Sequence, residues 1–187
     1  MARPILLTAL CATLAACGSD VRVPVPPVAP EARYSIPYGT VEVRDVLLPD
    51  YAQAQDIFVE EAGGVLTSEG GLLWADLPAR AATLELTQSL STVTGARVAS
   101  EPWPFDDYAE VRVEVRVTEF VASARTNEFR LAGQYYVATF DAEGRDRARD
   151  FRISVPLAPE FGPGNIAVAR SQAMTQLGVE IARDGLR

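Results

Sequence analysis

The sequence predicts an α+β fold in two layers, with a mixed, mostly antiparallel sheet of five to six strands and two amphipathic helices on one face. Several segments alternate apolar and polar residues, as half-buried strands do. Two others repeat apolar residues every three to four positions, as helices do. The 187 residues suffice for one domain, and 48% hydrophobic with 22% charged residues is typical of a folded chain.

Alternation with a period of two marks the strands. The first covers residues 40–48 and stops at Pro49, residues 57–60 and 65–68 flank Gly63-Gly64 as a hairpin, and residues 72–75 add a short strand. The clearest covers residues 109–120, where four valines share one face: Val111, Val113, Val115 and Val117. Residues 129–140 and a last strand through Phe151, Ile153 and Val155 follow after short turns. These three strands are expected to form an antiparallel meander.

Two helices are expected, one on each side of the meander in sequence. The first begins at Asp76-Leu77-Pro78, ends before Gly95, and carries apolar residues at helical spacing: Ala79, Ala82, Leu86, Leu90 and Val93. The second begins with Asn165 as N-cap, ends before Gly185, and carries a similar stripe: Ile166, Ala169, Ala173, Leu177 and Ile181. Both stripes are expected to face the sheet.

The composition excludes much enzyme chemistry. There is no His, all 17 positive charges are Arg, and there are two Cys. No Ser-His-Asp or Cys-His pair and no Walker A lysine can therefore form, and two Cys cannot close a structural zinc site. A net charge of −8 is unsuited to a surface that tracks phosphates. We expect no catalytic residue, metal, cofactor or nucleic-acid partner.

Two acidic pairs are the nearest candidates for carboxylate catalysis. Glu60-Glu61 lies in a strand, where neighbours point to opposite faces, and Asp106-Asp107 lies in a proline-rich loop. Both are interpreted as solvated surface acids. A hydrolase using carboxylates alone would need two acids converging in one pocket, which the strand register does not provide. The glycine pairs at 63–64 and 70–71 lack the lysine of a phosphate loop and are interpreted as turns.

The N-terminus has the features of an export signal. An apolar run at residues 5–14 follows Arg3 and is too short for a bilayer of ~30 Å. Leu14-Ala15-Ala16-Cys17 then resembles the lipobox of bacterial lipoproteins. This implies that residues 1–16 are a signal peptide and that Cys17 is the lipidated (palmitate-type) first residue of the mature chain. The alternatives are an ordinary secretory signal with a stray Cys and an internal Cys of a soluble core.

The segment that follows is rich in proline. Residues 17–33 contain Pro24, Pro26, Pro27 and Pro30, which predicts an extended tether that could hold the domain up to roughly 45 Å from its lipid. No further proline-rich break divides residues 34–187, which predicts a single domain. Gly18 stands where inner-membrane retention would place Asp, so we expect outer-membrane sorting.

Large apolar residues in exposed positions could contact partners. Trp103-Pro104-Phe105 lies in a loop and Trp74 follows a short strand, so each either caps the core or faces a partner. The first helix has a second apolar stripe roughly opposite its core face, which hints at self-association. The candidate partner or self-association surface consists of Tyr51, Trp74, Leu77, Ala81, Leu84, Trp103 and Phe105.

The order of several short motifs resembles the ABC-type transport auxiliary lipoprotein family of the PqiC (paraquat-inducible protein C) type. They are Tyr34-Ser35-Ile36-Pro37, Leu48-Pro49-Asp50-Tyr51, Leu73-Trp74-Ala75-Asp76-Leu77-Pro78, residues 113–120, a strand centred on Gly133, and the C-terminal helix. The resemblance covers almost the whole mature chain.

This resemblance implies an outer-membrane lipoprotein that faces the periplasm and forms homo-oligomeric rings. Its partners would be a periplasm-spanning MCE-domain protein with its inner-membrane permease and ATPase, in lipid transport between the membranes. The other interpretation is a structural or assembly lipoprotein that binds protein or glycan and handles no lipid.

Overall fold

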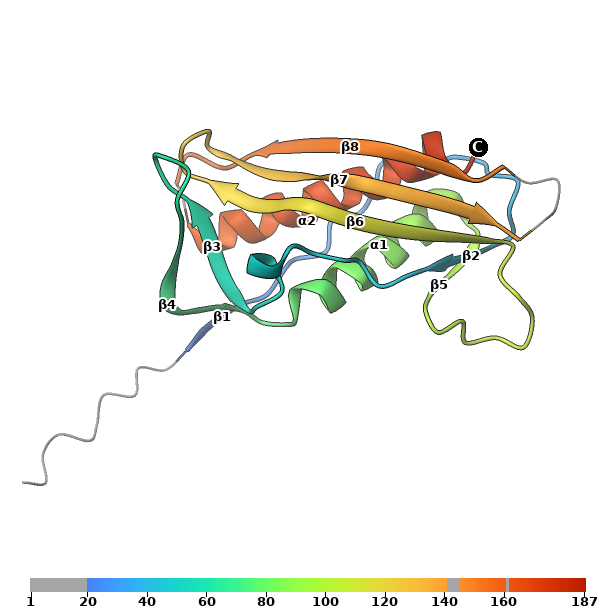
Figure 1. Cartoon of the computed structure of the whole chain (residues 1–187), viewed down its shortest axis with the longest axis horizontal. Helices are drawn as coiled ribbons and strands as arrows, with labels where there is room; N and C mark the ends of the chain where they lie inside the picture. The colour runs from blue at the N-terminus through green and yellow to red at the C-terminus, as the bar shows by residue number, and fades with distance from the viewer. Residues whose placement is uncertain (1–19, 141–144, 161) are drawn as a thin grey trace, which may run out of the picture.

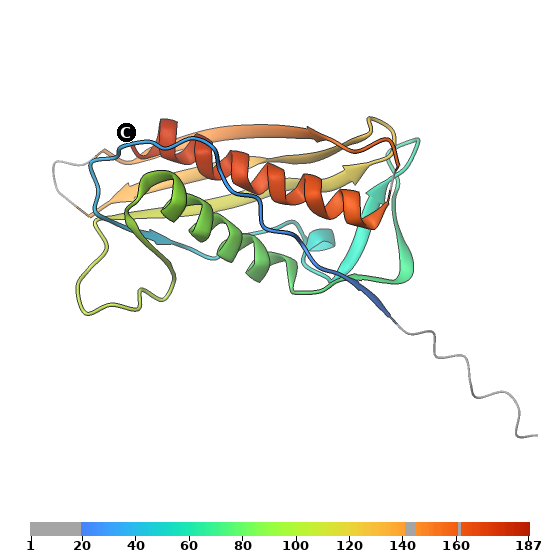
Figure 2. The ribbon, with the colours of Figure 1, turned by 180° about the vertical axis from the view of Figure 1, so that it is seen from behind.

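The computed structural model describes residues 20–140, 145–160 and 162–187, so the signal peptide and Cys17 lie outside the described residues. One layer is a sheet, and the other consists of two helices that both cover one face of it (Figures 1 and 2). The predicted α+β fold with both helices on one face is confirmed. The sheet has eight strands rather than five to six.

The strands are β1 (Val21–Val23), β2 (Thr40–Val43), β3 (Asp56–Glu60), β4 (Leu66–Trp74), β5 (Arg97–Ser100), β6 (Val111–Ser123), β7 (Glu128–Thr139) and β8 (Arg147–Pro156). The helices are α1 (Pro78–Thr94) and α2 (Pro163–Glu180), with a 3-10 turn η1 (Asp50–Ala52) and a π-helical turn η2 (Ile181–Gly185). α2 begins at Pro163 with Gly162 as N-cap, not at Asn165. The fixed φ of a proline already suits the first turn of a helix. Asn165 instead donates from Nδ2 to the Glu160 carbonyl oxygen.

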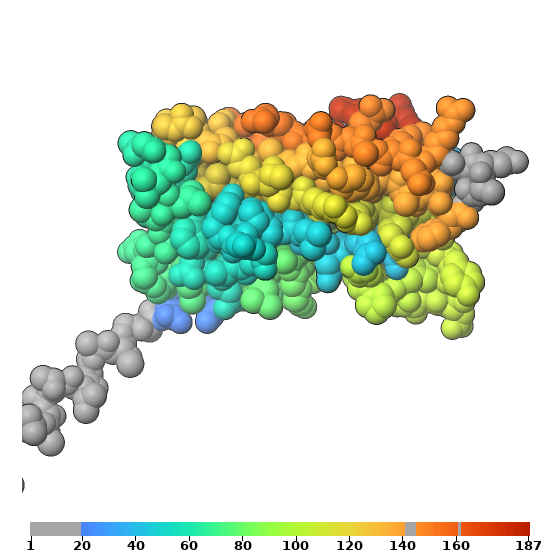
Figure 3. All heavy atoms as spheres, viewed as in Figure 1, coloured from blue at the N-terminus to red at the C-terminus, as the bar shows by residue number. Residues whose placement is uncertain are grey.

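The long strand β6 organises the sheet. β7 pairs antiparallel along one edge of β6 and β8 pairs antiparallel with β7, which confirms the predicted meander. The other edge of β6 is shared: β2 pairs parallel near its start and β3 pairs parallel near its end. β5 extends the sheet from β2, while β4 and then β1 extend it from β3. In Figure 3, the outer face shows β6–β8 (yellow to orange) beside the blue-green residues 40–60.

Three predicted strands differ in length or number from the structure. Residues 65–68 and 72–75 belong to one strand, β4, which continues through Gly71 at a φ of 82°. The first strand is shorter than predicted, and its residues 44–48 continue beside β6 through a single bridge, Leu47 with Arg116. β1 and β5 are additional. Each has only three or four residues and no long alternation to reveal it.

The proline-rich segment does not project as a spacer. After β1 it crosses the outer surface of both helices, as the blue chain in Figure 2 shows. Val23 is buried, its carbonyl oxygen accepts from the Ala75 N–H at 3.0 Å, and the Val28 carbonyl oxygen accepts from the Thr175 hydroxyl at 3.1 Å. The predicted extended shape is present, but residues 21–30 lie on the domain, so the stand-off of roughly 45 Å is wrong for them. We call residues 24–30 the strap.

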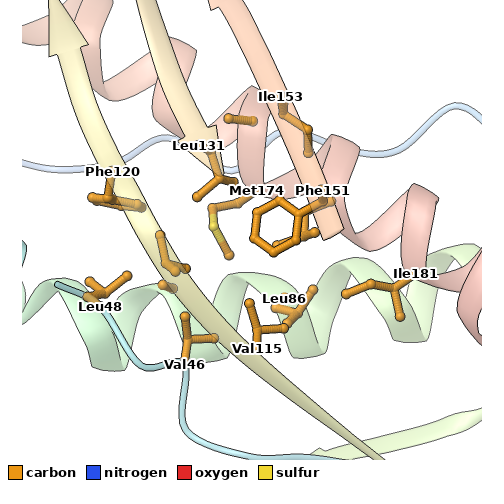
Figure 4. Packing of buried hydrophobic residues seen from close by; sticks show 14 of the residues in the cluster. Val46, Leu48, Leu86, Val115, Phe120, Leu131, Phe151, Ile153, Met174 and Ile181 are labelled. Atoms are coloured by element: carbon orange, nitrogen blue, oxygen red, sulfur yellow. The ribbon is translucent and has the colours of Figure 1, made fainter. Parts of the chain in front are cut away.

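The core lies between the sheet and the helices. The four valines predicted to face inward on β6 are buried in one cluster with Leu86 of α1 and Met174 of α2. Figure 4 shows Val115 among the residues of this cluster. The helices contact each other where Ser89 of α1 faces Gly178 of α2: a Cβ on Gly178 would lie 2.8 Å from the Ser89 Cβ. This glycine therefore sets how closely the helices approach.

A β-bulge in β6 changes which residues face the core. The register with β7 shifts between Val117 and Glu119, so the inward positions move from odd numbers to even ones, beginning with Phe120. Opposite the bulge lies Gly133, where a Cβ would stand 2.9 Å from the Val117 Cα and closer still to the Arg116 carbonyl oxygen. The Phe120 N–H donates to the Tyr51 hydroxyl at 2.9 Å. Tyr51 and Gly133 together make the bulge possible.

Candidate functional site

In the part of the chain that the structure describes, the paired acids Glu60 and Glu61 do not share a partner. Glu60 binds Arg130 at 2.8 Å and the Ser123 hydroxyl at 2.7 Å, and the Arg130 hydrogen bond, then that of Ser123, lower its pKa to about 2. Its neighbour Glu61 instead accepts from the Thr67 hydroxyl at 3.3 Å. The two acids therefore have separate partners. The interpretation of Glu60 as a solvated surface acid is wrong, because only 12% of its side chain is exposed and it is paired with Arg130. Among the described residues, no group of three or more His, Cys, Asp or Glu could hold a metal ion.

A groove of about 600 Å³ lies between the strap and the two helices, and we call it the strap groove. The strap forms its outer wall, with Val25 and Val28 and four prolines, and Trp74 and Leu84 extend the apolar lining. Polar residues of both helices also reach it, including Glu85 of α1 and Arg170 of α2. Its size falls within the range of small-ligand sites, which are mostly apolar with a few convergent polar groups.

Arg170 is the unusual residue of this groove. Only 1% of its surface is exposed, and its guanidinium carbon lies 5.0 Å from the Trp74 ring centroid and 5.4 Å from that of Phe120. The nearest anion is Glu85, whose Oε1 lies 3.0 Å from Arg170 Nη2. Buried arginines are stable only when they are paired and hydrogen-bonded, so the partners of this one decide its role.

Those partners are incomplete. Arg170 Nε and Nη2 and Glu85 Oε2 are buried without a hydrogen-bond partner among the described residues. Burial lowers the pKa of Arg170, with Glu85 opposing the shift, and burial raises the pKa of Glu85, with Arg170 opposing it. For both groups desolvation therefore exceeds the mutual attraction. A donor and an acceptor remain unused in one groove, and native proteins rarely leave such groups unpaired.

The candidate partner residues differ in how far they are exposed. Trp74 is buried beside Arg170 and so belongs to the core and the groove, not to an exposed surface. Tyr51 is half-buried at the bulge, packed edge-on against Phe58, and burial raises its pKa. Leu77 and Leu84 are exposed on α1 at 54% and 45%. Ala81, between them, is half-buried and lines the strap groove.

The loop after β5 holds a second aromatic group. Trp103 and Phe105 pack edge to face with centroids 5.0 Å apart, and the Arg97 guanidinium carbon lies 4.6 Å from the Phe105 centroid. Arg97 also pairs with Asp107, which accepts from Trp103 Nε1 at 3.3 Å. The loop is therefore braced by its own contacts, with Phe105 still 43% exposed. It lies on a different part of the molecule from Leu77 and Leu84, so the structure does not bring the predicted residues together.

Neither Arg170 nor Glu85 was predicted as a groove residue from the sequence. Arg170 lies four residues after Ile166 and three before Ala173, so helical spacing places it on the buried face of α2. A charged residue within a predicted core stripe was therefore the available signal. Glu85 follows Leu84 and precedes Leu86, at the border between the exposed stripe and the core stripe of α1, and nothing in its spacing distinguishes it.

The fold and groove define a class: an α+β domain whose described residues form a groove between a proline-rich strap and two helices. Among those residues, no helix is long and apolar enough to cross a membrane. The sequence model of the ABC-type transport auxiliary lipoprotein component matches residues 22–182. The chain belongs to this family, as its motifs predicted, and the family places it among lipoproteins of the cell envelope that serve ABC-type transport systems.

Solved structures agree on the fold. One crystal structure of an uncharacterised protein has a TM-score of 0.68 at 18% identity, covering 83% of this chain and 98% of its own. A Xanthomonas campestris protein assigned to the DUF330 family model has a TM-score of 0.63 at 16% identity, covering 87% of this chain and 90% of its own. No curated protein matches the chain.

Proposed function

We propose that this protein is the outer-membrane-anchored, non-enzymatic lipoprotein subunit of an MCE/ABC-type intermembrane lipid transport system. Its role would be to dock the periplasm-spanning MCE protein at the membrane. Membership of the transport auxiliary family over residues 22–182 is the observation that carries this proposal. The lipobox at Cys17 and the lack of His and Lys agree with an anchored adaptor.

Co-purification tests the partner. Affinity purification of the full chain from its native envelope should recover an MCE-domain protein with its permease and ATPase, together with phospholipid. Recovery of other envelope proteins or glycan without these would favour the structural or assembly lipoprotein instead and would contradict the transport role.

Replacing Cys17 tests the anchor. Two acyl chains bind a membrane stably, at ~0.8 kcal/mol per buried CH₂, so Cys17→Ser should move the protein from the membrane fraction to the soluble periplasm. The measurement is partition into a detergent phase, with Cys11→Ser as the matched control because Cys11 would leave with the signal peptide. Equal partition of both variants into detergent would exclude Cys17 as the lipidated residue.

A substitution in the exposed stripe on α1 tests whether the protein self-associates into a ring. Leu84 is 45% exposed, and a carboxylate there would be desolvated at an interface, so Leu84→Glu should convert oligomers into monomers without changing the fold. Light scattering gives the mass in solution, and circular dichroism checks the fold. Val65→Glu, in the exposed turn between β3 and β4, is the control. An oligomer that keeps its mass in the Leu84 variant removes this stripe from the interface.

A further inference from the structure

We infer that the strap groove binds the head group of a zwitterionic phospholipid of the phosphoethanolamine type, with phosphate at Arg170 and ammonium at Glu85. The inference names a ligand site within the proposed function. Only the choice of a membrane lipid rests on that function, since the groove and its unpaired groups are features of the structure itself.

The unpaired atoms define the head group. Arg170 Nε and Nη2 are buried donors that make no hydrogen bond of good geometry, although Nη2 lies 3.0 Å from Glu85 Oε1, and a phosphate offers oxygens that match a guanidinium fork. Glu85 Oε2 is a buried acceptor without a donor, and an ammonium group offers three. Because the two side chains carry opposite charges 3.0 Å apart, a lone anion would be attracted by Arg170 and repelled by Glu85. A ligand that carries both charges can place its anion at Arg170 and its cation at Glu85, so that each side chain attracts it.

Within the described chain, the strap makes no hydrogen bond to the unpaired atoms of Arg170 and Glu85. Pro24, Pro26, Pro27 and Pro30 have no N–H, so four of its seven residues cannot donate to Glu85. Among the described residues, the hydrogen bond that reaches the strap from outside is the one from Thr175 to the Val28 carbonyl oxygen. The strap therefore closes the groove mainly by apolar contact and leaves the polar groups for another occupant.

The apolar part of the remaining lining suits an acyl chain. Val23, Val25, Val28 and Leu84 face the groove along the strap and α1, and Trp74 lies beside the guanidinium. The groove is lined by every residue from Val23 to Pro30, a segment that runs from β1 across the outer surface of both helices (Figure 2). An amphiphile could thus place its head at Arg170 and part of its tail under the strap. A volume of about 600 Å³ accommodates a head group with part of one chain, not a whole phospholipid.

The test uses Trp74 as a reporter. The chain has two tryptophans, so Trp103→Phe leaves Trp74 alone in the groove, and Cys17→Ser keeps the protein soluble without changing the groove. Trp74 emission is followed during titration with monomeric lysophosphatidylethanolamine, lysophosphatidylglycerol and lysophosphatidylcholine of equal chain length. We expect the ethanolamine lipid to bind about tenfold more tightly than either of the others, because glycerol lacks the ammonium and choline lacks its N–H donors.

A double substitution separates head-group binding from packing. Glu85→Met with Arg170→Met keeps an apolar groove, and replacing a buried ion pair in this way is often neutral or stabilising. This variant should bind the three lipids equally, at least tenfold more weakly than the parent binds the ethanolamine lipid. Glu60→Gln, in β3 and outside the groove lining, is the control and should keep the preference.

Three results would overturn the inference. Equal binding of all lipids by the parent protein would leave an apolar groove only. Preference for the glycerol lipid would make it an anion site. No change in Trp74 emission with any lipid would mean that water alone fills the groove. None of these results affects co-purification with an MCE protein. If the protein keeps its lipid preference but does not co-purify with an MCE protein, only the proposed function is rejected.

Discussion

Gly133→Ala is expected to lower the free energy of unfolding by at least about 3 kcal/mol, the upper part of the range for overpacked sites. A Cβ at this position would meet backbone, the Val117 Cα at 2.9 Å and the Arg116 carbonyl oxygen nearer still, and backbone cannot rotate away as a side chain can. The β6–β7 pair would have to separate at the bulge. This would also disturb the Phe120 N–H that donates to Tyr51.

Thermal unfolding measures the effect. At about 2–4 °C per kcal/mol for a chain of this length, the melting temperature should fall by about 6–12 °C. Gly70→Ala is the matched control, since Gly70 also lies in a strand and no atom stands within 4 Å of its added Cβ. Its change should stay within about 0.5 kcal/mol. Equal melting temperatures for the two variants would show that the bulge does not need a glycine.

Arg170→Met is expected to destabilise the protein by about 3–5 kcal/mol, because it leaves Glu85 as an unpaired acid in an apolar groove. Burial already raises the pKa of Glu85, and loss of the arginine removes the opposing attraction. A group whose folded pKa is raised stabilises the fold below its unfolded pKa and loses that contribution as pH rises. Relative to the parent, the variant should therefore be less destabilised near pH 4 than at pH 7.5.

Urea unfolding at both pH values checks this expectation. The double variant Glu85→Met with Arg170→Met removes the unpaired charge and should return close to the parent stability, or exceed it. A single variant as stable as the parent at pH 7.5 would show that Glu85 is already satisfied by solvent. The inference that this groove binds a charged head group would then lose its physical basis.

The regular parts of this fold were predictable because each element carries one clear period. The valines of β6 alternate without interruption, and α1 lies between Pro78 and Gly95 with its stripe intact. The bulge was not predictable from the alternation, because the change of face after Val117 depends on a residue of another strand, Gly133. β1 was missed because three residues before Pro24 have no pattern of their own and pair only with β4.

The candidate site was less predictable than the fold. Exposed leucines on α1 follow from helical spacing alone, whereas the environment of Trp74 depends on α2 and the strap, which are far away in sequence. The pairing of Arg170 with Glu85 joins residues 85 positions apart. Spacing indicates which residues share a face of one helix, but not which residue of another helix lies opposite.

The position of β1 has a consequence for how the domain would sit on a membrane. With the proposed anchor at Cys17, only Gly18, Ser19 and Asp20 separate the acyl chains from the first residue of the sheet. Four residue steps span at most about 14 Å. The β1–β4 end would be held close to the bilayer with little freedom to tilt or turn, so the lipid anchor would set the orientation of the domain as well as its location.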